Sequence, residues 1–191
     1  HQLNELSSES EKLREYCQDR QLIDLLNDYP AEIDADSLVK LLHPQQPRLY
    51  SIASSPNAFE DEIHLTVSSL SYKTHGRSRL GGASGYLTQR IEEDDFIDIY
   101  LAENNSFRLP QDEQTPIIMI GAGTGIAPYR AFLQERVSRG SQGRNWLLFG
   151  NRHFHRDFLY HTDWIKHRRN GLLDRISVAF SRDQAERIYV Q

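Results

Sequence analysis

The chain has 191 residues, enough for one large domain or two small ones with a hydrophobic core. Hydrophobic residues make up 38% and charged residues 26%, as in ordinary globular proteins, and the net charge of −5 argues against general nucleic-acid binding. No apolar run is long enough to cross a bilayer, so we expect no membrane partner. A single cysteine, Cys17, excludes an internal disulfide, and with an N-terminus unlike a secretory signal it indicates the cytoplasm.

The first part of the chain, residues 1–46, combines acidic positions with leucine-rich ones, as in "EKLREYCQDRQLIDLLNDYP". Leucines at helical spacing in this stretch predict two short amphipathic helices. Asp34 or Asp36 is expected to cap a further helix that Pro44 ends. We interpret the region as a helical connecting segment without chemistry of its own.

Residues 47–112 show the alternation of short strands. "EIHLTVSSLSY" places Ile63, Leu65 and Val67 on one face, and "DFIDIYLAE", residues 95–103, repeats the pattern. Polar and glycine-containing turns separate these stretches, so the predicted fold is a small antiparallel β-barrel or sandwich.

From residue 113 to residue 191 the pattern becomes α/β. Apolar strands and amphipathic helices alternate in the order "TPIIMIG", "IAPYRAFLQERVSR", "NWLLFG", "DFLYHTDWIKHRRNG" and "DRISVAFS". Strand, helix, strand, helix, strand is typical of a doubly wound parallel sheet.

A glycine-rich turn joins the first of these strands to its helix through Gly121, Gly123 and Gly125. Glycine permits close approach of backbone to a ligand, and the N-terminus of a helix offers unpaired N–H groups to an anion. The spacing differs from the G-x-G-x-x-G fingerprint, and a tight turn alone is the alternative. The position after the first strand of an α/β unit favours phosphate binding.

The end of the third strand carries "SRD", residues 181–183, where ligands bind in open α/β sheets. No acidic residue clearly ends the second strand, which favours NADP over NAD. Ser181 is a hydrogen-bond donor, Arg182 and Arg187 are cations for a dianionic phosphate, and Tyr189 is suited to stack on adenine. For Arg187 alone, a solvated basic helix start is the alternative.

Three histidines fall in "RHFHRDFLYH": His153, His155 and His161. A metal site and a polar helix entrance are both compatible with this cluster. No matched carboxylate spacing accompanies the histidines, so the polar entrance is favoured and we expect no metal.

Taken together, several motifs carry a family resemblance. "RLYSIASS", "GGASGYL", "MIGAGTGIAPYRAFLQER", "LLFGNRHF" and "AFSRDQAERIYVQ" occur in the order and spacing of the ferredoxin–NADP⁺ reductase family. Within that family the chain resembles the diflavin reductases, most closely the branch that supplies a sulfite reductase hemoprotein. Ala122 and Tyr129 depart from the family, where Pro and Phe are common.

The resemblance implies FAD and NADPH as cofactors and assigns residues to each. Arg48 would pair with the FAD pyrophosphate, Tyr50 would lie against the isoalloxazine ring, and Ser51, near flavin N5, would be the catalytic candidate. The implied FAD residues are Arg48, Leu49, Tyr50, Ser51, Thr66, Val67, Ser68, Tyr72, Gly81, Gly82, Ala83 and Ser84. The implied NADPH residues are Gly123, Thr124, Gly125, Ser181, Arg182, Arg187, Tyr189 and Gln191.

By the same resemblance, hydride would pass from NADPH to FAD, and single electrons would pass through FMN to the hemoprotein (beta) subunit that reduces sulfite to sulfide for cysteine biosynthesis. We expect a piece of a longer protein: an FMN domain before residue 1, an incomplete FAD-binding barrel over 47–112, and the N-terminal part of an NADP-binding domain over 113–191. A diflavin reductase with another electron acceptor, and a catalytically silent fragment, are the alternatives.

Overall fold

The computed structural model describes residues 8–190. The described residues group into two compact units, one within His1–Arg48 and Ser69–Asp95, the other within Leu49–Ser68 and Phe96–Gln191. None of the described helices has both the length and the apolar character that crossing a membrane requires. The domain boundaries expected after residues 46 and 112 stay a prediction.

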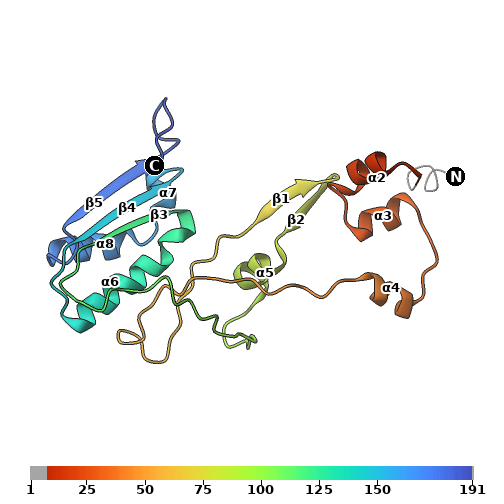
Figure 1. The fold of residues 1–191 in the computed structure, drawn as a ribbon. Helices are drawn as coiled ribbons and strands as arrows, with labels where there is room; N and C mark the ends of the chain where they lie inside the picture. Colours follow the sequence, from red (N-terminus) through yellow and green to blue (C-terminus); the bar gives the residue numbers. More distant parts are fainter. Residues whose placement is uncertain (1–7, 191) are drawn as a thin grey trace. The chain divides into compact units, whose positions relative to one another are not determined.

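The first unit contains the short helices predicted near the N-terminus. They are Ser10–Cys17 (α2), Leu22–Asp28 (α3) and Ala35–Leu41 (α4) (Figure 1). The carboxylate of Asp34 accepts a hydrogen bond from the Ser37 amide at 3.0 Å, so Asp34, not Asp36, is the cap of α4. Helices therefore occur in the region where the sequence predicts them, although α2 and α4 bury none of their residues.

An antiparallel hairpin follows in the same unit. Ser71–Thr74 (β1) pairs with Arg77–Leu80 (β2), and the two residues between them have positive φ, 48° at His75 and 72° at Gly76. Two successive positive φ angles are what a two-residue turn needs to match the strand twist. A short helix, Gly82–Gly85 (α5), and a π-helical turn, Tyr86–Arg90 (η1), come next.

Helix α3 is held to this hairpin by a buried ion pair. Asp24 is 1% exposed, and both of its carboxylate oxygens accept hydrogen bonds from Nη2 of Arg79. The amide of Gln21 donates to the same carboxylate at 2.9 Å, and Nη1 of Arg79 donates to the Gln21 side chain at 2.7 Å. The Gln21 amide and the Arg79 charge hold the pKa of Asp24 below its usual range.

The strand predicted over residues 95–103 is wrong for this structure. These residues form no regular element, and Phe96 and Leu101 are 99% and 72% exposed. Alternating side chains do not suffice, because a strand is stabilised by hydrogen bonds to a neighbouring strand. Of the other stretch with strand alternation, residues 62–72, only Leu65, in an isolated bridge to Ile52, and Ser71 and Tyr72, in β1, are paired. The described residues form no closed barrel.

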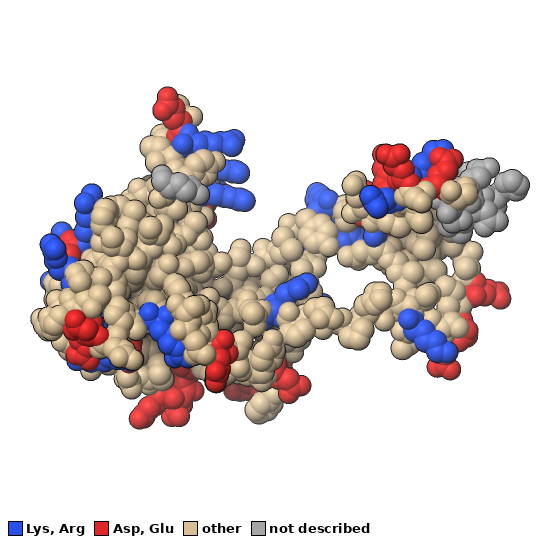
Figure 2. Space-filling view, viewed as in Figure 1, with Lys and Arg blue, Asp and Glu red and all other residues tan. Residues whose placement is uncertain are grey.

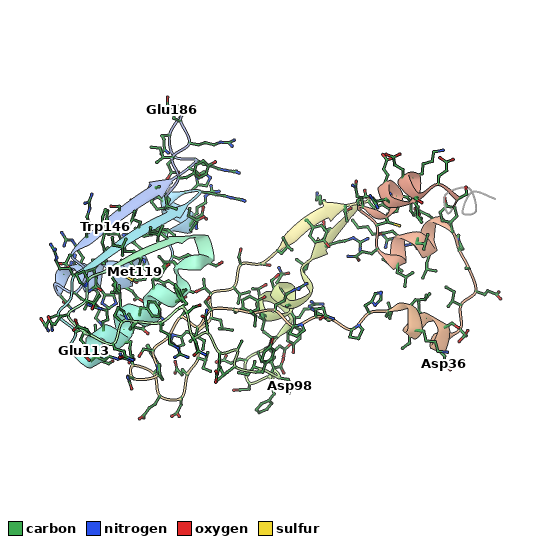
Figure 3. All side chains as sticks on the ribbon, viewed as in Figure 1. Asp36, Asp98, Glu113, Met119, Trp146 and Glu186 are labelled. Carbon is green, nitrogen blue, oxygen red and sulfur yellow. The ribbon has the colours of Figure 1, made fainter. Side chains whose placement is uncertain are left out.

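The parallel sheet of the second unit is confirmed. Its strands are Ile117–Ala122 (β3), Asn145–Asn151 (β4) and Arg175–Phe180 (β5), and they lie in the order β3–β4–β5 (Figure 1). Met119 of β3 is in register with Leu147 of β4. Figure 3 labels Met119 and Trp146 on the first two strands.

Helices cover one face of this sheet. A 3₁₀ turn, Gly123–Ile126 (η2), leads into Ala127–Arg139 (α6), and β4 is followed by Phe154–Asp157 (α7) and His161–Arg169 (α8). Leu133 of α6 and Trp164 of α8 are buried in one core with Met119. On the opposite face Ile118 and Ile120 are exposed, so the described residues contain helices on one face only of the predicted doubly wound arrangement.

Candidate functional site

A pocket of about 290 Å³ lies where the three parallel strands end. This carboxyl edge is the usual ligand-binding edge of an open α/β sheet. Gly123, Ser181, Arg182, Arg187 and Tyr189, all predicted from the sequence, are brought together there. The complete lining is Ala122, Gly123, Gly150, Asn151, Arg152, Ser181, Arg182, Arg187, Tyr189 and Val190, and predicted Gln191 lies outside the described residues.

Ser181 and Arg182 are positioned by a continuation of the strand pairing beyond β4 and β5. The amide of Ser181 donates to the Asn151 carbonyl at 2.9 Å, and the amide of Arg182 donates to the Arg152 carbonyl at 3.0 Å. The Ser181 hydroxyl also reaches the Asn151 carbonyl, at 3.4 Å. Backbone bonds therefore fix both residues at the mouth of the pocket.

Asp183 anchors the loop that follows. Its carboxylate accepts hydrogen bonds from the Phe154 amide at 2.7 Å and from Nδ1 of His153 at 2.9 Å. These two donors hold the pKa of Asp183 below its usual range. The loop that carries Arg182 is thereby tied to the start of α7.

The three clustered histidines have different surroundings. His153 bonds Asp183, His155 lies edge-on to the ring of Phe154, and His161 stacks on Phe158 with 4.7 Å between ring centroids. Within residues 8–190, no group of three or more His, Cys, Asp or Glu side chains is arranged to hold a metal ion. Packing and loop anchoring account for the positions of these rings.

The pocket has uncompensated positive charge. In the described part of the chain, the guanidinium groups of Arg152, Arg182 and Arg187 make no ion pair, and the nearby Asp183 is already bonded to His153. Figure 2 shows basic side chains gathered beside the loop after β5, whose tip is labelled at Glu186 in Figure 3. Guanidinium groups match the geometry of phosphate oxygens, so the residues present fit a phosphate-bearing ligand.

The glycine-rich turn lies at one side of this pocket. Gly123 has a φ of 54°, and a side chain added there would meet nothing within 4 Å, so the turn needs glycine for its backbone and leaves room above it. Gly121 instead packs closely, since an added Cβ would be 3.0 Å from the Gly125 carbonyl oxygen. Thr124 and Gly125 are exposed in the η2 turn before α6 and do not line the pocket.

Six of the residues predicted to bind FAD lie in the second unit. Leu49 and Ser51 are exposed and Tyr50 is half-buried, directly before the bridge between Ile52 and Leu65. Directly after that bridge, the hydroxyl of Thr66 hydrogen-bonds the hydroxyl of Tyr160. Val67 and Ser68 continue without regular structure. The Ile52–Leu65 bridge and the bond from the Ala53 amide to the His64 carbonyl therefore bring these two parts of the chain together. We call residues 49–57 the first arm and residues 62–68 the second arm.

The other predicted FAD residues, Arg48, Tyr72, Gly81, Gly82, Ala83 and Ser84, belong to the first unit. The Gly81 amide donates to the Leu70 carbonyl at 2.8 Å, and Oγ of Ser84 accepts from the Leu70 amide at 3.2 Å. Both groups are thus engaged within the protein. The amides of Gly82–Ser84 form the first turn of α5, where a helix has no internal acceptors.

Tyr72 and Arg48 differ in their surroundings. The Tyr72 hydroxyl accepts a hydrogen bond from the Gln21 side chain at 3.4 Å. Arg48 is exposed, and it makes no ion pair with any residue that the structure describes. The assignment of these residues to FAD stays a prediction.

Sequence reasoning did not assign Ala122, Gly150, Asn151, Arg152 or Val190 to the site, and all five line the pocket. "FGNR" places Asn151 and Arg152 directly after the second strand, so the rule that ligands bind at carboxyl ends could have found both. Val190 had no such signal. A Cβ added to Gly150 would be 2.5 Å from Cγ1 of Val190, so this glycine makes room for the chain that follows β5.

Comparison with known proteins agrees with these observations. A family model described as "FAD binding domain" matches residues 1–86, and one described as "Oxidoreductase NAD-binding domain" matches residues 119–191. Relatives named "Sulfite reductase [NADPH] flavoprotein alpha-component" are 52% identical in Vibrio vulnificus, 50% in Mannheimia succiniciproducens and 51% in Yersinia enterocolitica. The matches cover 99%, 99% and 97% of this chain, but only 31%, 32% and 31% of the relatives.

The chain thus spans about a third of the length of these curated relatives. The predicted resemblance, including the two cofactor-binding regions, is confirmed. The chain thus contains one segment that matches the FAD binding domain family and one that matches the oxidoreductase NAD-binding domain family, and over nearly its whole length it is similar to sulfite reductase flavoprotein alpha-components.

Proposed function

We propose that the pocket at the carboxyl edge of the sheet binds the adenosine end of NADPH. The observation that carries this proposal is the set of three guanidinium groups, Arg152, Arg182 and Arg187, which line one pocket without a carboxylate partner among the described residues. The 2′-phosphate of NADPH is a dianion that NADH lacks, and it supplies the missing negative charge.

Individual roles follow from this placement. Ser181, Arg182 and Arg187 hold the 2′-phosphate, and Tyr189 stacks on the adenine. The η2 turn faces the pyrophosphate: Gly123 leaves free space beside its backbone, and Thr124 and Gly125 follow it in the same turn. Gln191 completes the adenosine site by family resemblance.

For FAD, the proposal rests on the family match over residues 1–86 and on the resemblance of the motifs. The residues assigned to it are the twelve named from Arg48 to Ser84, and the antiparallel segments that carry them belong to an FAD-binding barrel. Arg48 and the amides of Gly82–Ser84 bind the pyrophosphate, and Tyr50 packs on the flavin ring. Ser51 is the candidate catalytic residue beside flavin N5.

The reaction follows from these two sites. Bound FAD supplies the chemistry, since a flavin accepts a hydride and releases electrons singly. The residues of this chain bind the phosphates of NADPH, orient the nicotinamide and exclude water. In the whole protein, we propose, electrons continue through FMN to a sulfite reductase hemoprotein, as the names of the relatives support. A different electron acceptor is the second candidate.

A binding experiment tests the NADPH assignment directly. Titration calorimetry on the purified chain should show 2′,5′-ADP binding about tenfold or more tighter than 5′-AMP, because the added phosphate makes charge-assisted hydrogen bonds. Equal affinities would contradict the assignment of the 2′-phosphate. In a separate titration, quenching of FAD fluorescence reports whether this chain takes up flavin, and no quenching would support the catalytically silent alternative.

A further inference from the structure

One arginine on α6 joins four segments of the second unit. Nη1 of Arg130 hydrogen-bonds the Ala53 carbonyl and Nδ1 of His64, each at 2.9 Å. Its Nε donates to Asp163 of α8 at 2.7 Å. Ala53 and His64 face each other on the two paired arms, where the Ala53 amide donates to the His64 carbonyl at 2.8 Å. A single guanidinium therefore spans both arms and both helices.

Burial and aromatic contacts restrict this guanidinium to one place. Ala53 is fully buried, and the Arg130 side chain in its ion pair with Asp163 is 13% exposed. Its guanidinium carbon lies 4.8 Å from the ring centroid of Tyr160 and 5.9 Å from that of Phe59. A planar guanidinium that makes three hydrogen bonds and lies close to two aromatic rings has little rotational freedom. It therefore fixes the distance between the segments it joins, in addition to supplying a charge.

The next turns of α6 hold the first arm a second time. The Ser55 amide donates to the Gln134 side chain at 3.0 Å, and the Ser55 hydroxyl donates to Glu135 at 2.5 Å. Asn57 donates to the same carboxylate at 2.9 Å. Ser55 is 2% exposed, so this contact is also closed to water.

The second arm is held by Tyr160, whose hydroxyl bonds Thr66. Tyr160 has a φ of 57°, a backbone conformation that is unfavourable for a bulky residue. Such a conformation persists only where surrounding contacts over-determine it, and such residues cluster at functional sites. Here the ring of Tyr160 touches both the arm and Arg130.

We infer that Arg130 is a positioning residue for hydride transfer: it fixes the distance between the arms that carry Ser51 and Thr66 and the helix that begins at the glycine-rich turn. This inference rests on the proposed function. Ser51 lies two residues before Ala53, and Arg130 lies in the first turn of α6, directly after the Gly123–Ile126 turn. Both proposed ligand-contacting stretches are therefore linked through one side chain.

The expected effect is on rate rather than on binding. Hydride transfer requires the reacting atoms to be nearly in contact, and a displacement of about 1 Å costs on the order of 10²-fold in rate. The pocket around Arg182 does not touch Arg130, so affinity for the adenosine end should not change.

The test uses the full-length reductase with its cofactors bound. Anaerobic stopped-flow should show Arg130→Met reducing flavin with NADPH on the order of 10²-fold more slowly, with affinity for 2′,5′-ADP within about twofold of wild type. Hydrogen exchange should show faster exchange at the amides of Ala53 and His64, a readout independent of activity. Arg144→Met is the matched control, because Arg144 is exposed and its side chain has no partner within residues 8–190.

The remaining outcomes separate failure of this inference from failure of the proposed function. A wild-type rate in R130M overturns the inference alone, and loss of FAD or of 2′,5′-ADP binding overturns it in favour of a purely structural role. A wild-type enzyme that NADPH does not reduce overturns the proposed function and the inference with it. If R130M does not fold, Arg130→Lys makes the same test, because lysine keeps the positive charge but lacks the planar guanidinium with its several fixed donors. We then expect flavin reduction to be about three- to tenfold slower, with unchanged affinity for 2′,5′-ADP.

Discussion

Replacing Arg136 tests how much a buried guanidinium contributes to the stability of this structure, because its side chain lies among backbone carbonyls. It is 2% exposed, and it donates to the carbonyls of Gly143 at 2.7 Å and of Thr115 and Glu113 at 3.3 Å each. Burial lowers the pKa of this guanidinium. In Arg136→Met, Gly143 and Glu113 keep other donors, whereas the Thr115 carbonyl keeps none among the described residues.

The expected loss in unfolding free energy follows from the number of carbonyls left without a donor. One orphaned carbonyl costs about 1–3 kcal/mol, and lost charge-assisted bonds add to this, while relief of guanidinium desolvation offsets part. We expect Arg136→Met to lower the unfolding free energy by about 2–4 kcal/mol, which for a chain of this length lowers Tm by roughly 5–15 °C.

Urea and thermal unfolding followed by circular dichroism measure this change. Arg139→Met is the matched control three residues along α6, since Arg139 is 41% exposed and its pair with Glu135 is worth only about 0.3–0.5 kcal/mol. Equal losses in the two variants would refute the reasoning, because burial and backbone bonding of Arg136 would then contribute nothing.

Three further predictions concern the pocket and the core. In the full-length reductase, Arg182→Gln should weaken NADPH by about 10- to 100-fold and leave NADH kinetics nearly unchanged, and equal losses for both would contradict a 2′-phosphate contact. Gly150→Ala should weaken 2′,5′-ADP binding in calorimetry, since the new Cβ would meet Val190 at 2.5 Å; wild-type affinity would show that the chain after β5 moves freely. Burial lowers the pKa of His167, so wild-type stability should fall as pH drops below about 6.5, where the unfolded state takes up a proton that the folded state resists. Urea midpoints at acidic and neutral pH should show a smaller fall in His167→Gln.

The α/β half could be predicted well from sequence because its signals are local. Buried parallel strands are nearly continuous apolar runs, and Gly140, at the end of α6, has the positive φ of a helix terminus. The 95–103 stretch has an equally clear alternation and still forms no strand. Alternation indicates which side chains share a face, whereas pairing depends on another segment of chain being available.

The candidate site shows the same division. Ser181 and Arg182 could be placed because they follow a strand directly, and the carboxyl edge is where ligands bind. Arg152 follows β4 as directly as Ser181 follows β5, so the same rule could have found it, whereas Val190 is brought against Gly150 only by the fold. The contact of Arg130 with both arms joins positions 77 and 66 residues apart, and neither composition nor periodicity indicates it.

The grouping of Leu49–Ser68 with the parallel sheet has a consequence for protein engineering. A chimera that exchanges nucleotide-binding halves between two reductases at a junction near residue 112 would separate Arg130, Gln134 and Glu135 from the arms they hold. Exchanging the 49–68 stretch together with residues 96–191 keeps both sides of that contact from the same parent. Recombination between reductases to change coenzyme preference should therefore give folded chimeras more often when residues 49–68 and 96–191 are exchanged together than when a single crossover near residue 112 is used.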